Sequence, residues 1–117
     1  MALEAEVFKM DRRIRYCGIL DVMGRTISGG MRPGVKSLEP ENEAERVDLQ
    51  MALTRGMSES ASSYLGATNY VIIQRERLML IALPRSDHRT VLVGAEPDFP
   101  LDRLEALRKV VDQNYPT

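Results

Sequence analysis

The sequence predicts an α/β fold, a three-layer α/β/α sandwich around a five-stranded, mainly antiparallel sheet. Three observations lead to this prediction. The segment 16–30, YCGILDVMGRTISGG, has the pattern of two short strands joined by a glycine-containing turn. The segment 41–65 has helical periodicity and would connect the second strand to the third. The run 78–83 is apolar at nearly every position, which is typical of a strand covered on both faces.

The first elements are a short helix and a hairpin. A helix from Ala2 to about Arg13 is predicted because apolar residues recur every three or four positions, at Leu3, Val7, Met10 and Ile14. In the strand that follows, alternation places Ile14, Tyr16, Gly18 and Leu20 on one face, and Cys17 and Ile19 on the other. Asp21 and Gly24 mark the turn. The pair Gly29–Gly30 predicts a bulge or a close approach of two backbones in the return strand.

The remaining elements complete the order α-β-β-α-β-β-β-α. A long helix from Glu41 to Leu65 is expected to end at Gly66, a residue suited to a helix C-cap. Three strands follow, at 68–75, 78–84 and 89–96, with a tight charged turn near Glu76 and Arg77 between the first two. The last helix is expected to begin near Pro100. Its buried stripe would be Leu101, Leu104, Leu107 and Val111.

Size and composition narrow the class of protein. The chain has 117 residues, so a single domain over 1–117 is expected. The formal net charge of −1 disfavours a broad basic surface for nucleic acid, and no window is apolar enough to span a bilayer. The N-terminal segment lacks the apolar core of a secretory signal, which makes the cytoplasm the expected location. The single cysteine excludes an internal disulfide.

The residues that could act in catalysis or ligand binding are better explained by structural roles such as turn formation and burial. The one histidine, His88, lies in the polar segment RSDHRT, where turn formation accounts for it. Cys17 lies in a predicted inner strand and is expected to be buried and inert. The glycines of SGGMRPG could cradle a phosphate, but no Walker pattern follows them. Asp21 and Arg25 could touch a ligand, although the turn explains them equally well. We therefore expect no catalytic residue, no metal site and no cofactor.

The long helix is the most informative segment for function. Its apolar residues cover about 200° of the helical wheel, where a helix resting on one sheet needs little more than 100°. These residues are Val47, Leu49, Met51, Leu53, Met57, Ala61, Tyr64 and Leu65. Either the helix is deeply buried in its own monomer, or it packs on its sheet and also on a partner. Its polar face carries Arg55, Glu59 and Ser62.

The segment GILDVMGRTISGG resembles the opening hairpin of the roadblock fold, the α/β domain of dynein light chains and of regulators of small GTPases. The longer segment 14–38, IRYCGILDVMGRTISGGMRPGVKSL, with QMAL at 50–53 and YLG at 64–66, resembles a family of small, functionally uncharacterised proteins from ammonia-oxidising archaea. The resemblance implies a dimer that pairs an edge strand and a helix across a two-fold axis. It also implies a scaffold or GTPase regulator, not an enzyme.

Two functions from different classes remain open. The first is a homodimeric interaction module that recruits or regulates a small GTPase. Its expected dimer interface is Leu53, Met57, Tyr64, Tyr70, Ile72 and Ile73, and its expected partner-binding residues are Arg55, Glu59 and Ser62. The second is a small-molecule sensor of PAS or profilin-like shape. A sensor of that kind usually adjoins an output domain, for which a chain of this length has no room, so the scaffold is preferred.

Overall fold

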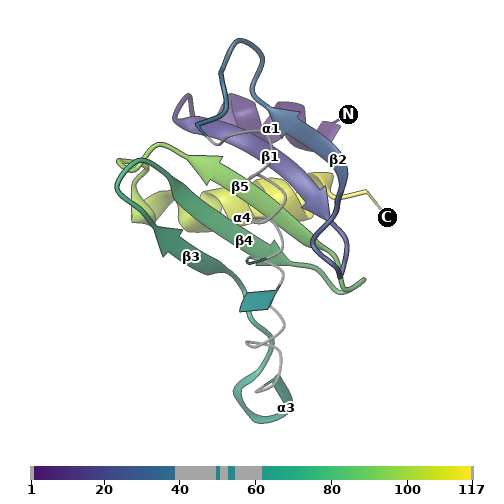
Figure 1. The fold of residues 1–117 in the computed structure, drawn as a ribbon. Helices are drawn as coiled ribbons and strands as arrows, with labels where there is room; N and C mark the ends of the chain where they lie inside the picture. Colours follow the sequence, from purple (N-terminus) through teal and green to yellow (C-terminus); the bar gives the residue numbers. More distant parts are fainter. Residues whose placement is uncertain (1, 39–49, 51–52, 55–61, 117) are drawn as a thin grey trace.

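The computed structural model describes residues 2–38, 50, 53–54 and 62–116. Within them, five strands form one sheet in the order β2-β1-β5-β4-β3, and every neighbouring pair is antiparallel (Figure 1). The strands are β1 (Ile14–Leu20), β2 (Thr26–Met31), β3 (Val71–Gln74), β4 (Met79–Pro84) and β5 (Thr90–Ala95). The helical elements are α1 (Ala2–Met10), α3 (Ser62–Leu65), the 3₁₀ turn η1 (Leu101–Arg103) and α4 (Leu104–Asn114). The predicted α/β class and order of elements are confirmed.

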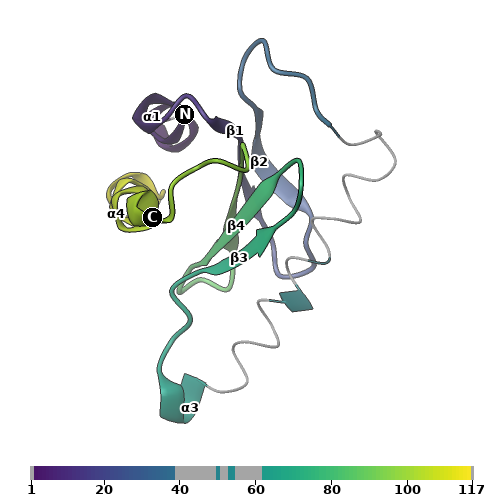
Figure 2. The same ribbon diagram turned by 90° about the vertical axis from the view of Figure 1, so that its left-hand side faces the viewer.

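Helices α1 and α4 lie next to each other on one face of the sheet (Figure 2). They bury the main core, in which Leu3 and Val7 of α1 and Leu107 and Val111 of α4 pack on the strands. The opposite face is also apolar and buried, at Leu20, Leu80, Ala82 and Leu92.

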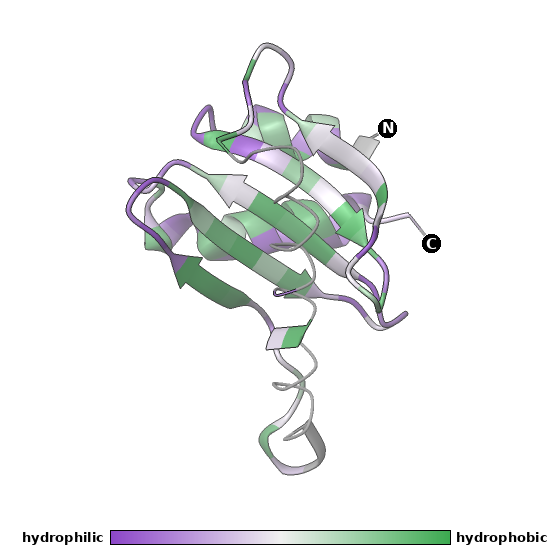
Figure 3. Cartoon of the chain, in the orientation of Figure 1, coloured by the Kyte–Doolittle hydropathy of each residue, from purple (hydrophilic) through white to green (hydrophobic). Residues whose placement is uncertain are grey.

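Both faces of β4 are therefore buried, as the apolar run 78–83 predicts, and β4 is apolar along its length (Figure 3). Most of the predicted long helix, 41–65, lies outside the described residues. Its last turn is α3, and Gly66 follows with φ +87°, the left-handed conformation expected of a C-capping glycine.

The β1–β2 turn is built by Asp21, as predicted. Its Oδ1 accepts hydrogen bonds from the main-chain N–H groups of Met23 and Arg25, each at 2.9 Å, and its Oδ2 accepts one from the Arg25 guanidinium at 3.1 Å. Hydrogen bonds from the Arg25 and Met23 main chain and the charge of Arg25 hold the pKa of Asp21 below its usual value, against a smaller opposing effect of burial. Gly24 supplies the positive φ of 84°. Asp21 and Arg25 are thus accounted for by the turn.

Gly29 provides the predicted close approach of two backbones. Its φ is +96°, and a Cβ added there would overlap the carbonyl oxygen of Cys17 and the Cα of Gly18 on the paired strand. Gly30 differs, because a Cβ at that position would meet nothing within 4 Å. Only the first glycine of the pair is required by the backbone.

The predicted face of Ile14 is wrong. The register of β1 against β5 shifts between Ile14, which pairs with Ala95, and Tyr16, which pairs with Gly94. Two steps along β1 therefore match one step along β5, so Arg15 is the extra residue of a β-bulge. The bulge reverses the alternation, and Ile14 joins Cys17 in the core under α1 and α4, whereas Tyr16 packs on the other face.

The prediction that Leu101 belongs to the buried stripe of the last helix is also wrong. Leu104, Leu107 and Val111 are buried, but Leu101 is 61% exposed. The first turn after Pro100 is a 3₁₀ helix, η1, which advances 120° per residue where an α-helix advances about 100°. A residue in that turn is therefore rotated away from the stripe that continues along α4.

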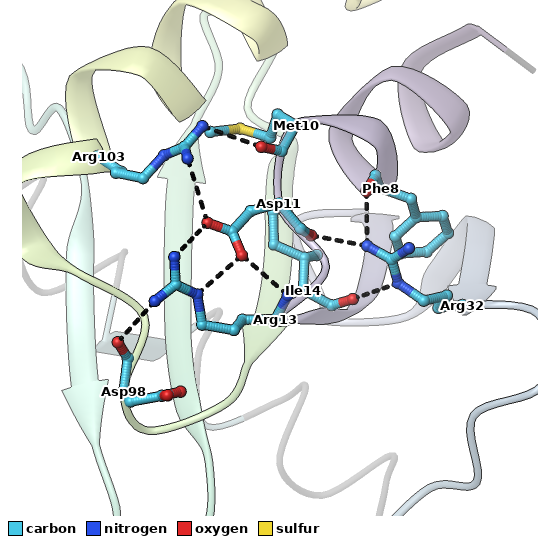
Figure 4. A network of polar contacts seen from close by, with 8 residues as sticks. All are labelled: Phe8, Met10, Asp11, Arg13, Ile14, Arg32, Asp98 and Arg103. Atoms are coloured by element: carbon cyan, nitrogen blue, oxygen red, sulfur yellow. Dashed lines mark hydrogen bonds and ion pairs between the residues drawn. The ribbon is translucent and has the colours of Figure 1, made fainter.

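The first helix ends at Met10, three residues before the predicted end, because the chain turns around the Asp11 carboxylate (Figure 4). The Asp11 side chain is buried, with 3% of its surface exposed. It accepts hydrogen bonds from the main-chain N–H of Arg13 at 2.9 Å and from two nitrogens of the Arg13 guanidinium, and it forms an ion pair with Arg103 at 3.5 Å. These interactions, led by the Arg13 side chain, lower the pKa of Asp11 despite its burial.

Arg32, the residue after β2, binds the same connection between α1 and β1. Its guanidinium donates to the main-chain carbonyls of Phe8, Asp11 and Ile14, and it lies 5.2 Å from the centre of the Phe8 ring (Figure 4). Two of these carbonyls lie at or just after the C-terminal end of α1, where carbonyl groups lack partners within the helix. Arg32 therefore acts as a C-terminal cap that ties β2 to α1.

Replacing Asp11 by Asn should destabilise the protein by about 1–3 kcal/mol at neutral pH, because Asn keeps the shape but loses the charge that Arg13 and Arg103 pair with. The lowered pKa adds stability above the ordinary Asp value of 3.8, and this stability is lost as the pH falls through the lower folded-state pKa. The difference between the two proteins in urea unfolding should therefore shrink below about pH 4. Asp98→Asn, which removes an exposed carboxylate beside the same arginine, is the control and should change stability little. A difference that persisted at pH 2 would contradict the role of the charge.

Replacing Gly29 by Ala should lower the free energy of unfolding by about 2–4 kcal/mol, since it combines backbone strain at positive φ with overlap of the Cys17 carbonyl. Gly30→Ala is the matched control one residue away, and we expect it to change stability by less than about 1 kcal/mol. Thermal and urea unfolding of the two variants would check the contrast. Equal effects would show that the glycine pair has another role.

Candidate interaction surface

The strand β3 and the helix α3 that precedes it form the candidate site, which we call the β3 surface. In the described sheet β3 pairs with β4 alone, from Val71 opposite Ala82 to Gln74 opposite Met79, without a register shift. The strand is therefore an edge, as predicted, although it is shorter than the predicted 68–75. A regular edge offers a row of main-chain N–H and C=O groups to an incoming strand.

The side chains of the β3 surface are partly occupied by the protein's own core. Tyr70 and Ile72 pack against the core under α1 and α4, and Ile73 packs with Val71 on the opposite face. Each of these side chains is half-buried. What remains available at this edge is thus the main chain, with part of the apolar surface on both sides of it.

The exposed apolar side chains near β3 belong to the helical segment before it. Tyr64 and Leu65 of α3 are 77% and 76% exposed, and Leu53 is 61% exposed. Both ribbon views place α3 beyond the β3 edge of the sheet, away from α1 and α4 (Figures 1 and 2). Tyr64 and Leu65 are neighbours in the chain, and exposed apolar side chains that adjoin one another are found at surfaces that bind a partner.

Several of the predicted site residues fall outside the part of the chain that the structure describes. Met57, Arg55 and Glu59 are outside it, and Ser62 is described only as the first residue of α3. The structure therefore places Ile72 and Ile73 on β3 and Tyr70 directly before it. The geometry of the predicted partner-binding residues stays a prediction.

The groups considered for chemistry have structural roles. Cys17 is fully buried, and burial, reinforced by the charge of Glu4, raises the pKa of its thiol to about 12, so the reactive thiolate is suppressed. His88 takes a positive φ of 69° in the β4–β5 turn, where its N–H donates to the Arg85 carbonyl. The neighbouring Asp87 accepts hydrogen bonds from the Arg89 main chain and from the Tyr115 hydroxyl, at 3.0 and 2.7 Å.

The hydrogen bond between Tyr115 and Asp87 shifts the pKa of both groups. Burial raises the pKa of Tyr115 to about 12, and the Asp87 carboxylate adds to the rise. For Asp87 burial acts in the raising direction, but the hydrogen bonds from Tyr115 and Arg89 outweigh it and the pKa falls. Arg85 also stacks on the Tyr115 ring at 4.8 Å and pairs with Asp112 at 2.7 Å. Together these contacts attach the C-terminal end of α4 to the β4–β5 turn.

The segment SGGMRPG does not form a phosphate cradle. Gly29 allows the close approach of β2 to β1. Gly34 takes a positive φ of 83° in a turn that is closed by a hydrogen bond from the Val35 N–H to the Arg32 carbonyl. The Arg32 guanidinium is already hydrogen-bonded to three main-chain carbonyls. The described residues contain no group of three His, Cys, Asp or Glu placed to hold a metal ion. Sequence reasoning missed the roles of Asp11, Arg32 and Tyr115, because each acts through residues distant in the chain or through main-chain carbonyls.

The arrangement of the elements matches a set of solved structures over almost the whole chain. The gliding protein MglB from Thermus thermophilus superimposes with a TM-score of 0.69 at 14% identity, covering 95% of this chain and 87% of that one. The roadblock/LC7 domain from Streptomyces avermitilis superimposes with a TM-score of 0.67 at 14% identity, covering 95% and 92%. This chain has the roadblock/LC7 fold. MglB from Myxococcus xanthus agrees, with a TM-score of 0.64 at 11% identity and coverage of 95% and 92%.

At these identities the likeness establishes the fold alone. No protein-family model matches the chain, and no curated protein matches it either. Among the helices that the structure describes, none is long and apolar enough to cross a membrane. The expected roadblock fold is confirmed. Among the described elements, β3 has the regular edge to which another strand could add.

Proposed function

We propose that this roadblock domain, 1–117, is a non-enzymatic scaffold of an archaeal cytoplasm that pairs with a second copy of itself and recruits or regulates a small GTPase. The observation that carries the proposal is the β3 surface: a strand of regular register at the edge of the described sheet, beside exposed apolar side chains, on a roadblock fold. The resemblance to roadblock proteins supports the pairing of two copies, and the resemblance to the archaeal family supports the setting.

The proposed dimer pairs β3 with its copy in antiparallel orientation. Such a contact is isologous, the commonest geometry of small oligomers, and it extends two five-stranded sheets into one of ten strands. Pairing satisfies the outer main-chain groups of β3 and covers the exposed parts of Tyr70, Ile72 and Ile73. The helices that precede the two strands then meet near Leu53, Met57 and Tyr64.

The proposed partner surface is the polar side of the paired helices. It presents Arg55, Glu59 and Ser62 twice, related by the two-fold axis. A net charge near zero provides no long-range attraction to nucleic acid, so a protein is the more suitable partner. We expect binding or scaffolding, since the chain offers no arginine that we would assign to catalysis of GTP hydrolysis.

Replacing Met57 by Glu should convert the dimer to a monomer. A charge placed in the apolar helix contact loses its hydration without gaining a partner, at a cost of several kcal/mol, which corresponds to a rise in the dimer dissociation constant of about a hundredfold or more. Met57→Leu conserves volume and polarity and is the matched control. Size-exclusion chromatography with light scattering at tens of micromolar checks both variants. A monomeric wild type would refute the dimer, and a dimeric Met57→Glu would refute the helix contact.

The partner surface is tested by reversing its charges. The double variant Arg55→Glu, Glu59→Arg should remain dimeric by light scattering but lose the small GTPase that wild type retains in a pull-down from native lysate. The pull-down is run with lysate supplied with GDP or with a non-hydrolysable GTP analogue, because regulation implies a preference for one nucleotide state. Recovery of the same GTPase by wild type and double variant would remove these residues from the partner surface.

A further inference from the structure

We propose that the outer edge of β2, on the side of the sheet opposite to β3, binds an extended acidic segment of a partner protein by strand addition. The strand β2 has β1 as its one neighbour in the described sheet, and no residue of β2 is buried. The proposal does not depend on the dimer, because β2 and β3 are separated by the other three strands.

The register of β2 shows which main-chain groups face outward. The N–H of Arg32 donates to the carbonyl of Arg15 at 2.7 Å, and Met31 lies opposite Tyr16. Because hydrogen-bonded and non-hydrogen-bonded pairs alternate in an antiparallel ladder, Met31 directs its N–H and C=O away from β1. The two residues before it, Gly29 and Gly30, have no side chains to obstruct an approaching chain. An incoming strand can therefore pair with the end of β2.

From Val22 to Leu38 the charged residues along this edge are all basic, and Asp21, just before this segment, forms an ion pair with Arg25. The segment 22–38, from the hairpin tip to the loop after β2, contains Arg25, Arg32 and Lys36 and no acidic residue. Arg32 is bonded to three carbonyls, so the cations that face solvent are Arg25, whose side chain is 72% exposed although it contacts Asp21, and Lys36. They stand before and after the strand. An extended segment with carboxylates near its two ends complements this arrangement.

Apolar contacts are available beside the edge. Val22 and Met23 at the hairpin tip are 65% and 61% exposed, and Ile27 at the start of β2 is 46% exposed. The turn does not require them to be apolar, because Asp21 and Gly24 build it through main-chain hydrogen bonds and a positive φ. The same hydrogen bonds hold the tip in one conformation, which lowers the entropy lost on binding.

A second copy of this chain is a poor occupant of the β2 edge. Antiparallel pairing of β2 with its copy would set Arg25 of each chain near the segment 32–36 of the other, where the charges are also positive. In addition, the register shift at Ile27 and the left-handed Gly29 twist the edge, which opposes the pairing of two equally twisted strands. A short, flexible segment can follow this twist.

The probe is a labelled nine-residue peptide with alternating Val and Glu, compared with the same peptide carrying Lys in place of Glu. Fluorescence anisotropy should show saturable binding of the Glu peptide below 1 mM, weakening about tenfold between 50 and 300 mM salt, and no binding of the Lys peptide. Equal binding of the two peptides, or no binding of the Glu peptide at 1 mM, would overturn the proposal.

Two variants and one exchange measurement locate the peptide. The double variant Arg25→Gln, Lys36→Gln should weaken binding at least tenfold. The double variant Arg75→Gln, Arg77→Gln removes two exposed cations from the turn after β3, on the far side of the sheet, and should leave binding unchanged. In hydrogen exchange followed by NMR, the peptide should slow exchange at the Met31 amide. Protection that appears at Val71–Gln74 instead would assign the peptide to β3 and refute the proposal.

Discussion

The buried carboxylate of Asp11 connects α1, β1 and α4, and the helical layer on one face of the sheet depends on this connection. It ends α1 by drawing the chain into a turn, and it pairs with Arg13, just before β1, and with Arg103, the last residue of η1 before α4. The Arg103 guanidinium also donates to the carbonyl of Met10 at 2.9 Å. The two helices that cover one face of the sheet are thus fixed to each other and to β1 at one place. A buried charge of this kind is tolerated because its oxygens are well supplied with donors.

The two edges of the sheet differ in a way that bears on assembly. The edge at β3 is regular in register, with apolar side chains on both faces, and suits pairing with an equivalent strand. The edge at β2 has a register shift, a left-handed glycine and cations at both ends, which suit a different, flexible and acidic partner. Bulges and charged side chains are among the features that oppose the pairing of a sheet edge with an identical strand. Within the described sheet the two edges therefore differ both in the regularity of their register and in the charge beside them.

The side chains of the proposed β3 contact also contribute to folding. Tyr70, Ile72 and Ile73 belong to the core on their two faces and keep only part of their surface for a partner. In the proposed dimer, a substitution that shortens one of them would therefore affect stability and association together. Tyr64, Leu65 and Leu53, in contrast, leave most of their apolar surface uncovered.

Local pattern in the sequence was enough to predict the order of elements, the Asp21–Gly24 turn, the Gly66 cap, the doubly buried strand at 78–83 and the β3 edge. Each of these depends on neighbours along the chain or on hydrophobic periodicity, both of which a sequence displays directly. The face of Ile14 and the exposure of Leu101 required the tertiary structure, because a single bulged residue or one tighter helical turn changes the phase of a pattern without changing its composition. The roles of Asp11 and Arg32 required it as well, since Asp11 meets Arg103 and Arg32 meets Phe8 only when helices and strands distant in the chain come together.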